Sequence, residues 1–224
     1  MYMEIQLSVK INSQMQIVSR LGFYSSFVAF IAATGYCIVQ LMQVAGVMKF
    51  PIDAYLIYGF SLGIAAPFVI AVIALHYLLP QEKRIWSLIA LSFAIMYATY
   101  VNLNYVVQLA TVIPATLQGS LNAIRVLDQT PHSLFWDIDA LGYICMGIST
   151  FSLTFAFTPE WKWLRRFLFA NGVMVPVISF VYFYPHFSTG ILLIGLPWII
   201  TAPGSLLLLA VFFRSKKKFQ DEFS

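Results

Sequence analysis

The sequence predicts an all-α fold, a polytopic membrane helical bundle of six transmembrane helices with both termini in the cytoplasm. Of its 224 residues, 60% are hydrophobic and only 10% are charged, whereas an ordinary soluble domain has about 25% charged residues. The apolar residues form six long runs between short polar turns, and the basic residues gather in alternate turns. We therefore expect one bundle, residues 21–213, between a cytoplasmic tail of residues 1–20 and a basic cytoplasmic tail of residues 214–224.

The segment before the first span alternates apolar and polar residues, which is the period of a β-strand. A single strand has no partner in this chain, so we expect a flexible or interfacial tail. The first apolar run is far longer than the roughly 7–15 residues of a signal-peptide core, which favours a retained helix. At about 20 residues per crossing, we expect spans at residues 21–47, 54–79, 85–113, 133–157, 167–184 and 189–213.

Polar, proline-marked turns separate the predicted spans, as at Pro80 and Pro159. The longest connection, residues 114–129, has apolar residues three and four positions apart, which is typical of an amphipathic helix lying on the membrane surface. Thr130 and Pro131 match the N-cap and first position of a helix, so we expect the fourth span to begin there.

Basic residues predict the orientation, because cytoplasmic loops of membrane proteins are rich in Lys and Arg. Only Lys49 and Arg125 fall in segments expected outside. Eleven basic residues fall in segments expected inside: Lys10, Arg20, Lys83, Arg84, Lys162, Arg165, Arg166, Arg214, Lys216, Lys217 and Lys218. This alternation favours an even number of spans with both termini in the cytoplasm.

Several classes of function lack their sequence signals. The net charge of +4 comes from helix ends and one short tail, so we expect no nucleic-acid partner. Cys37 and Cys145 lie in apolar runs without metal-ligand spacing and are expected to be packed thiols. No lysine falls inside a span and no histidines pair, so we expect no retinal, haem, metal or other cofactor. Hydrolase, protease and nucleotide-binding motifs are also missing.

One polar stripe runs along the third predicted span. Its members, spaced three and four residues apart, are Tyr97, Tyr100, Asn104, Gln108 and Thr111. They either hydrogen-bond to neighbouring helices or line a ligand cavity. A similar stripe on the first span, formed by Tyr36, Gln40 and Gln43, is the candidate to face it.

Two carboxylates open the fourth span. Asp137 and Asp139 lie about 200° apart around a helix, so at most one of them faces the bundle interior. Asp139 shares a face with Tyr143, Met146 and Thr150, and this face is expected to be the inner one. Alternatively, both acids lie near the outer headgroups, where a helix N-terminus favours negative charge.

The outer side of the membrane is expected to hold the titratable cluster of the chain, which comprises Lys49, Arg125, His132, Asp137, Asp139 and His186. In the last span, the segments Gly195–Pro197 and Ala202–Gly204 predict a kinked or locally unwound helix. Broken helices occur at transport sites, and they also arise from packing alone.

A resemblance adds to this picture. The stretch Asp-Ile-Asp-Ala-Leu-Gly-Tyr from Asp137 to Tyr143, followed by Met-Gly-Ile-Ser-Thr from Met146 to Thr150, resembles a pattern in small, uncharacterised six-span bacterial integral membrane proteins. The resemblance implies a bundle in the bacterial inner membrane and carries over no catalytic residues.

These observations favour a protein that binds a small hydrophobic molecule or a membrane lipid in an outer-half pocket, as a transporter or sensor component. The candidate ligand-binding residues are Gln40, Tyr97, Tyr100, Asn104, Gln108, Asp139, Tyr143 and His186. One alternative is an intramembrane enzyme, of isomerase or cyclase type, that uses Asp139 as acid or base on a lipid-like substrate. Another is an assembly or scaffold protein, which needs no pocket.

Overall fold

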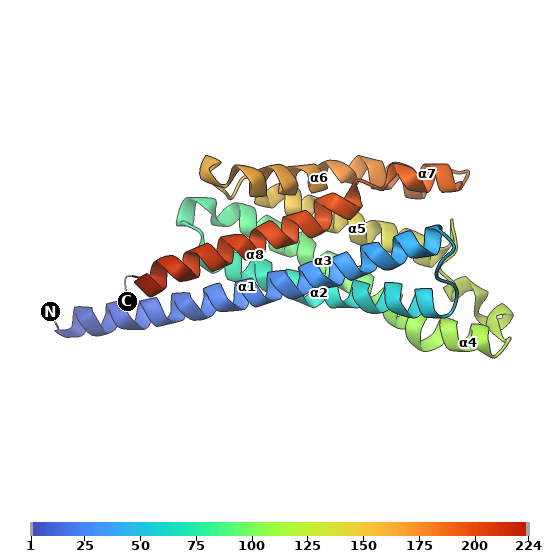
Figure 1. Ribbon diagram of the computed structural model, residues 1–224, viewed down its shortest axis with the longest axis horizontal. Coiled ribbons are helices and arrows are strands. Elements are labelled where there is room, and N and C mark those ends of the chain that lie inside the picture. The colour runs from blue at the N-terminus through green and yellow to red at the C-terminus, as the bar shows by residue number, and fades with distance from the viewer. Residues whose placement is uncertain (1, 223–224) are drawn as a thin grey trace.

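The computed structural model describes the backbone of residues 2–222 and the side chains of residues 13–216. Within that backbone every regular element is helical and no strand occurs. Six long helices run along one axis of the molecule (Figure 1): α1 (Tyr2–Val44), α2 (Ile52–Leu78), α3 (Arg84–Val107), α5 (Leu134–Leu153), α6 (Lys162–Phe183) and α8 (Trp198–Glu222). The predicted all-α class is confirmed.

Shorter helical pieces join the long helices. The π-helix η2 (Gln108–Val112) and the short α4 (Ile113–Leu117) extend α3, and α7 (Thr189–Ile194) precedes α8. Three 3-10 turns lie in the connections: η1 (Gln81–Lys83), η3 (Leu121–Leu127) and η4 (Pro159–Trp161).

Five helical segments of the described chain are long and apolar enough to cross a membrane. They are Ser13–Val44, Ile52–Leu78, Gln81–Leu117, Pro159–Phe183 and Thr189–Lys216. Helix α5 is not among them, although its 20 residues would extend about 30 Å. It carries two carboxylates, Asp137 and Asp139, in its first two turns.

The six long helices form a closed ring. Going round it, α1 packs on α2, α2 on α3, α3 on α5, α5 on α6, α6 on α8, and α8 on α1. Helix α1 begins and α8 ends at the same end of this ring (Figure 1). We call the half of the bundle away from that end the distal half.

The helices approach closely because small residues lie between them. Gly147 on α5 is an example, since a Cβ atom there would lie 2.5 Å from Cγ2 of Val175 on α6. Nearby, the Ser149 hydroxyl donates to the carbonyl of Ala90 on α3 at 2.8 Å. Small residues and interhelical hydrogen bonds of this kind are typical of helix packing in membranes.

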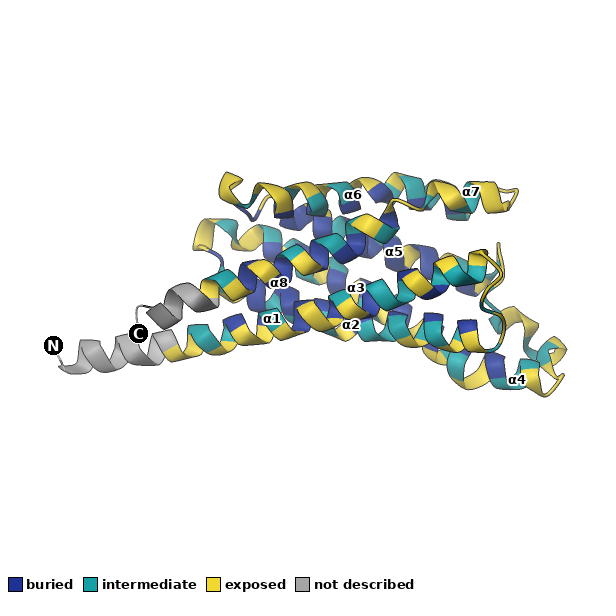
Figure 2. Cartoon of the chain, viewed as in Figure 1, coloured by how far each residue is buried: buried dark blue, intermediate teal, exposed yellow. Residues whose placement is uncertain are grey.

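Large apolar side chains cover the outside of the ring. Figure 2 shows buried residues on the inward faces of the helices and exposed residues along the outward faces. The exposed side chains include Ile31, Ile38, Val106 and Ile200. An outer surface of this composition is suited to contact with lipid rather than with water.

Two expected features outside the predicted spans differ in the structure. The segment before residue 21, expected to be a flexible or interfacial tail, is helical from Tyr2 and continues into α1. A continuous helix satisfies the backbone hydrogen bonds that an unpaired strand would leave open. The expected amphipathic helix at residues 114–129 is also interrupted: α4 ends at Leu117, and the 3-10 turn η3 follows.

The N-cap of the fourth long helix was predicted wrongly, although the predicted span of residues 133–157 begins within one residue of α5. The N-cap of α5 is Ser133, whose hydroxyl accepts a hydrogen bond from the Trp136 backbone N–H at 3.2 Å, whereas Thr130 was expected to serve as the cap. Thr130 instead lies in the preceding turn, where its carbonyl accepts from the Ser133 N–H at 3.0 Å. His132 adopts a positive φ of 65° in this turn.

Candidate functional site

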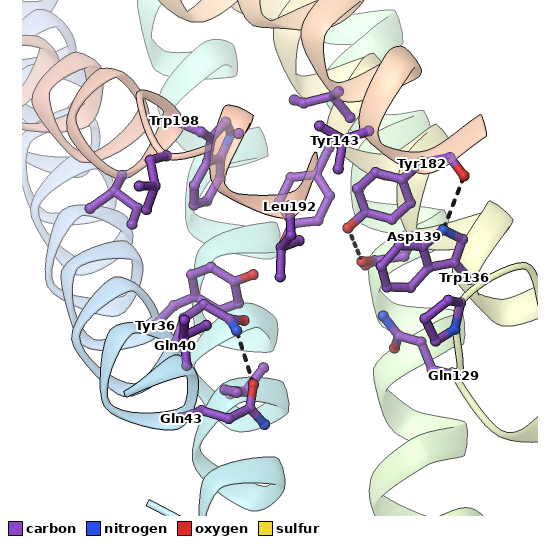
Figure 3. A pocket seen from close by; sticks show the side chains of 18 of the residues that line it. Tyr36, Gln40, Gln43, Gln129, Trp136, Asp139, Tyr143, Tyr182, Leu192 and Trp198 are labelled. Carbon is purple, nitrogen blue, oxygen red and sulfur yellow. Dashed lines mark hydrogen bonds between the residues drawn. The ribbon is translucent and has the colours of Figure 1, made fainter. Parts of the chain in front are cut away.

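A cavity of about 450 Å³ opens in the distal half of the bundle. Helices α1 and α2 form one side, α3, α5 and α6 form the other, and the break between α7 and α8 covers it (Figure 3). Its walls are mainly apolar and aromatic. The aromatic side chains that line it are Tyr36, Tyr58, Tyr105, Trp136, Tyr143, Tyr182, Phe187 and Trp198.

Asp139 is the acid in the wall of this cavity. It is only 3% exposed, and its Oδ1 accepts a hydrogen bond from the Tyr105 hydroxyl at 2.6 Å. The other oxygen, Oδ2, accepts from the Tyr182 hydroxyl at 2.7 Å (Figure 3). Asn104 Nδ2 makes a longer contact with Oδ1 at 3.4 Å. Side chains of α3 and α6 thus donate hydrogen bonds to a carboxylate that α5 directs into the bundle.

The tyrosine hydroxyls are linked to each other as well. Tyr105 and Tyr143 lie 3.2 Å apart, oxygen to oxygen, so the carboxylate and both hydroxyls form one network. Trp136 packs on Tyr182 with ring centroids 4.4 Å apart, and its indole N–H donates to the Tyr182 carbonyl at 3.2 Å. These contacts fix the orientation of the ring that holds Asp139.

Amides behind the carboxylate connect it to the distal loop. Asn104 Nδ2 donates to Gln129 Oε1 at 3.0 Å. Gln108 receives a hydrogen bond from the Gln129 backbone N–H at 3.3 Å and donates to the Leu127 carbonyl at 2.8 Å. The stripe on α3 therefore anchors the loop that closes one side of the cavity.

The opposite side of the cavity carries a second polar chain. Gln40 Nε2 donates to Gln43 Oε1 at 2.9 Å, and Gln43 Nε2 donates to Asp53 Oδ2 at 2.8 Å. Asp53 is buried, and its Oδ1 accepts from the Ala54 N–H at 2.8 Å in the first turn of α2. The Asp53 carboxylate therefore lies at the N-terminus of α2, where negative charge is favoured.

The last predicted span is broken at Gly195, as expected, whereas at Pro203 helix α8 continues without a break. Between α7 and α8 the chain turns at Gly195, and Gly195, Leu196 and Trp198 line the cavity. The freed carbonyls find local partners: that of Leu192 accepts from the Gly195 N–H at 3.0 Å, and that of Gly195 accepts from the Trp198 N–H at 3.0 Å. The break shapes the wall without leaving these carbonyls open.

The candidate residues from the sequence occupy three kinds of position. Asp139, Tyr143 and Gln40 line the cavity. Asn104 and Gln108 are buried behind it and hold the carboxylate and the loop.

The other three candidates lie outside the lining. Tyr97 is buried seven residues before Asn104 on α3, where its ring packs edge-on against Phe68 with ring centroids 6.0 Å apart. Tyr100 is half-buried, and His186 is exposed beside Tyr184. Their role as ligand residues stays a prediction.

The expected titratable cluster does not assemble around Asp139. Its partners are tyrosines and an amide, whereas the other expected members, Lys49, Arg125, His132, Asp137 and His186, are exposed and do not line the cavity. Turns at the distal end of a bundle can share a membrane side without sharing a pocket. Within the described part of the chain, no group of three His, Cys, Asp or Glu side chains could hold a metal ion.

Sequence reasoning missed Tyr105 and Tyr182. Tyr105 follows Val101 by four positions and Tyr97 by eight, so helical spacing alone would have added it to the stripe. Tyr182 had no such signal, because it lies 43 residues from Asp139 and meets it only through the packing of α5 on α6.

Comparisons of the chain with models of protein families, with functionally described proteins and with solved structures find no match. The resemblance carried by residues 137–150 therefore stays a prediction. The cavity and the residues around it are the observations from which a function can be inferred.

Proposed function

We propose that the protein spans the membrane six times, with α5 crossing in addition to the five apolar segments, and with both termini in the cytoplasm. The closed ring supports this, because α5 fills the place between α3 and α6. Twelve of its 20 residues are buried, so it can cross the membrane with less apolar sequence than a helix that faces lipid. The location we propose is a bacterial inner membrane, which rests on the resemblance in α5 alone.

Cysteine labelling tests this topology. In a background with Cys37→Ala and Cys145→Ala, single cysteines at Gln118 and Gln220 should react with an impermeant maleimide from opposite sides of the membrane. Gln118, at the distal end, should be labelled in intact cells, and Gln220 only after permeabilisation. Labelling of both positions in intact cells would contradict six crossings.

We also propose that the distal cavity binds a small, largely apolar molecule or part of a lipid, as a transporter or sensor component would. One observation carries this proposal: a cavity of about 450 Å³ combines aromatic and aliphatic walls with a single buried carboxylate. Sites for small molecules are typically concave and mostly apolar, with a few placed polar groups that fix orientation. In the proposed topology the cavity opens in the outer half of the membrane.

Saturable photolabelling tests this binding. Trifluoromethyl-phenyldiazirine, a small apolar photoreactive probe, should label cavity segments of α5 and α6 in protein reconstituted in nanodiscs. An excess of the same compound without an isotopic label should compete at Trp136 and Tyr182. Positions that face lipid, such as Ile31 and Ile200, should show labelling that does not saturate.

Two tryptophan substitutions on one helix provide a matched control. Ala54 lines the cavity, so Ala54→Trp should fill it and abolish the saturable labelling. Ala66 is exposed on the same helix α2, so Ala66→Trp should leave the labelling unchanged. Equal labelling of the two variants, or labelling of Trp136 without saturation, would count against a binding cavity.

An intramembrane enzyme is the second candidate, favoured by one feature of the same site. Asp139 lies in the cavity wall beside two tyrosine hydroxyls, at 2.6 and 2.7 Å, and such neighbours can exchange protons with a bound molecule. A lipid-like substrate would have to be altered chemically by the purified protein. Mass spectrometry of a membrane lipid extract incubated with wild type and with Asp139→Asn would detect such a change.

A further inference from the structure

The cavity contains one formal charge. Among the described residues that line it, Asp139 is the only charged one, and no Lys, Arg or His is present. Its partners Tyr105, Tyr182 and Asn104 are neutral groups that each donate a hydrogen. The carboxylate is thus arranged purely as an acceptor, as an ionised carboxylate is. Because an unpaired charge inside a membrane is costly, a positively charged ligand would supply what the protein lacks there.

The aromatic walls suit the same kind of ligand. The ring of Trp198 meets Tyr143 edge-on at 5.1 Å and Tyr36 edge-on at 5.6 Å, and Trp136 lies against Tyr182. Figure 3 shows these rings on both sides of the space next to Asp139. Aromatic faces attract cations within about 6 Å of the ring centroid, and groups of such rings recognise quaternary ammonium ions.

A neighbouring cavity is lined by acids too. A second cavity of about 320 Å³ shares Gln43, Ala54 and Tyr58 with the first. Asp53 and Asp128 line it, and no basic residue is present among its described lining residues. A cleft lined by charges of one sign raises the local concentration of counter-ions. A cation would therefore be favoured in this neighbouring cavity as well as beside Asp139.

We propose that the ligand of the distal cavity is a lipophilic organic cation, an amine or quaternary ammonium with an apolar body, whose charge pairs with Asp139 among the aromatic rings. This inference rests on the function proposed above, because it names the ligand class of the same cavity. The apolar body of the ligand would lie against the aliphatic wall formed by residues such as Leu192 and Leu193.

An isosteric pair of probes tests the charge. Phenyltrimethylammonium and tert-butylbenzene have nearly the same shape and differ by a positive charge. In competition with trifluoromethyl-phenyldiazirine at matched concentrations in the bilayer, the cation should protect Trp136 and Tyr182 at a concentration at least about tenfold lower than the neutral compound, as expected when a ligand charge meets a buried partner. Equal protection by the two compounds would overturn the proposal.

Two isosteric substitutions on one helix separate the role of the buried acid from that of any acid nearby. Asp139→Asn should weaken binding of phenyltrimethylammonium, measured by calorimetry, by at least about tenfold. Asp137 is exposed two residues away, so Asp137→Asn should bind as wild type does. Unchanged affinity in Asp139→Asn would also overturn the proposal. If that variant does not fold, the probe pair on the wild-type protein decides.

The proposed function and this inference can fail separately. If the diazirine labels the cavity saturably and phenyltrimethylammonium does not compete, the cavity binds apolar molecules and the cation proposal is wrong. If the diazirine labelling does not saturate, both proposals are wrong. Protection by the cation together with its loss in Asp139→Asn is the result we expect.

Discussion

Among the buried polar clusters that join neighbouring helices, those around Asn171 and Asp139 differ in what surrounds them. In the Asn171 cluster, Asn171 on α6 donates to Thr150 on α5 at 3.0 Å and accepts from Thr201 on α8 at 3.1 Å. In the Asp139 cluster, α5 offers Asp139 to tyrosines of α3 and α6. Along α5, Asp139 and Thr150 are about 16 Å apart.

The Asn171 cluster is neutral and enclosed. Its amide and hydroxyl groups satisfy one another, Asn171 and Thr150 are 1% exposed, and neither residue lines either of the two cavities described above. The Asp139 cluster carries a charge and faces an open volume. Buried polar groups are therefore not a site by themselves: the first cluster joins helices, whereas the second combines charge, aromatic walls and space.

The largest effect on stability is expected from the tyrosines that hold Asp139. Removing both hydroxyls with Tyr105→Phe and Tyr182→Phe leaves the carboxylate without its two short hydrogen bonds, each worth about 1.5–3 kcal/mol if the acceptor is charged. Unfolding in detergent, by denaturant or by heat, should show the loss of stability. Tyr184→Phe, at an exposed position, is the control. Wild-type stability of the double variant would mean that Asp139 does not depend on these donors.

A smaller loss of stability is expected from enlarging a side chain between two closely packed helices. Gly147→Val would press against the β-branched Val175, because even a Cβ atom at residue 147 lies 2.5 Å from its Cγ2. Overpacking of this kind costs about 1–3 kcal/mol. By contrast, Ala54→Leu extends into the cavity and should change stability by less than about 0.5 kcal/mol. Similar losses in both variants would mean that the distal half is as tightly packed as the rest.

The smallest effect is expected from the Asn171 cluster. Thr201→Val removes one interhelical hydrogen bond, which in membrane proteins contributes about 0.6 kcal/mol on average. Unfolding should detect this small loss, while the affinity for phenyltrimethylammonium should stay at the wild-type value. If Thr201→Val weakened binding as much as Asp139→Asn, the distinction between the two clusters would be wrong.

Local patterns predicted much of the fold. Apolar runs of span length correspond to the six long helices, with ends within a few residues for α2, and Gly195 with Pro197 predicted the break before α8. The π-helix at residues 108–112 was not predicted. It inserts extra residues into the turn, so Thr111, expected in line with Gln108, is exposed.

The sequence predicted those site residues whose position depends on the spacing within a single helix. Asp139 and Tyr143 share a face of α5, and Gln40 follows Tyr36 by one turn on α1, so helical spacing brought these residues toward a common interior. Tyr182 required knowledge of which helix lies next to α5. Ser133 as the cap of α5 depends on the turn that places His132 at positive φ, which the single sequence did not reveal.

A crystal structure with a brominated ligand would test the central claim most directly. Bromophenyltrimethylammonium carries a bromine atom, whose anomalous signal locates the molecule independently of how its electron density is interpreted. We predict one bromine peak inside the distal cavity, with the ammonium group within about 6 Å of the Trp198 or Tyr36 ring and on the side of Asp139. A cavity without a bromine peak at saturating ligand, or a peak only on the lipid-facing surface, would contradict the account.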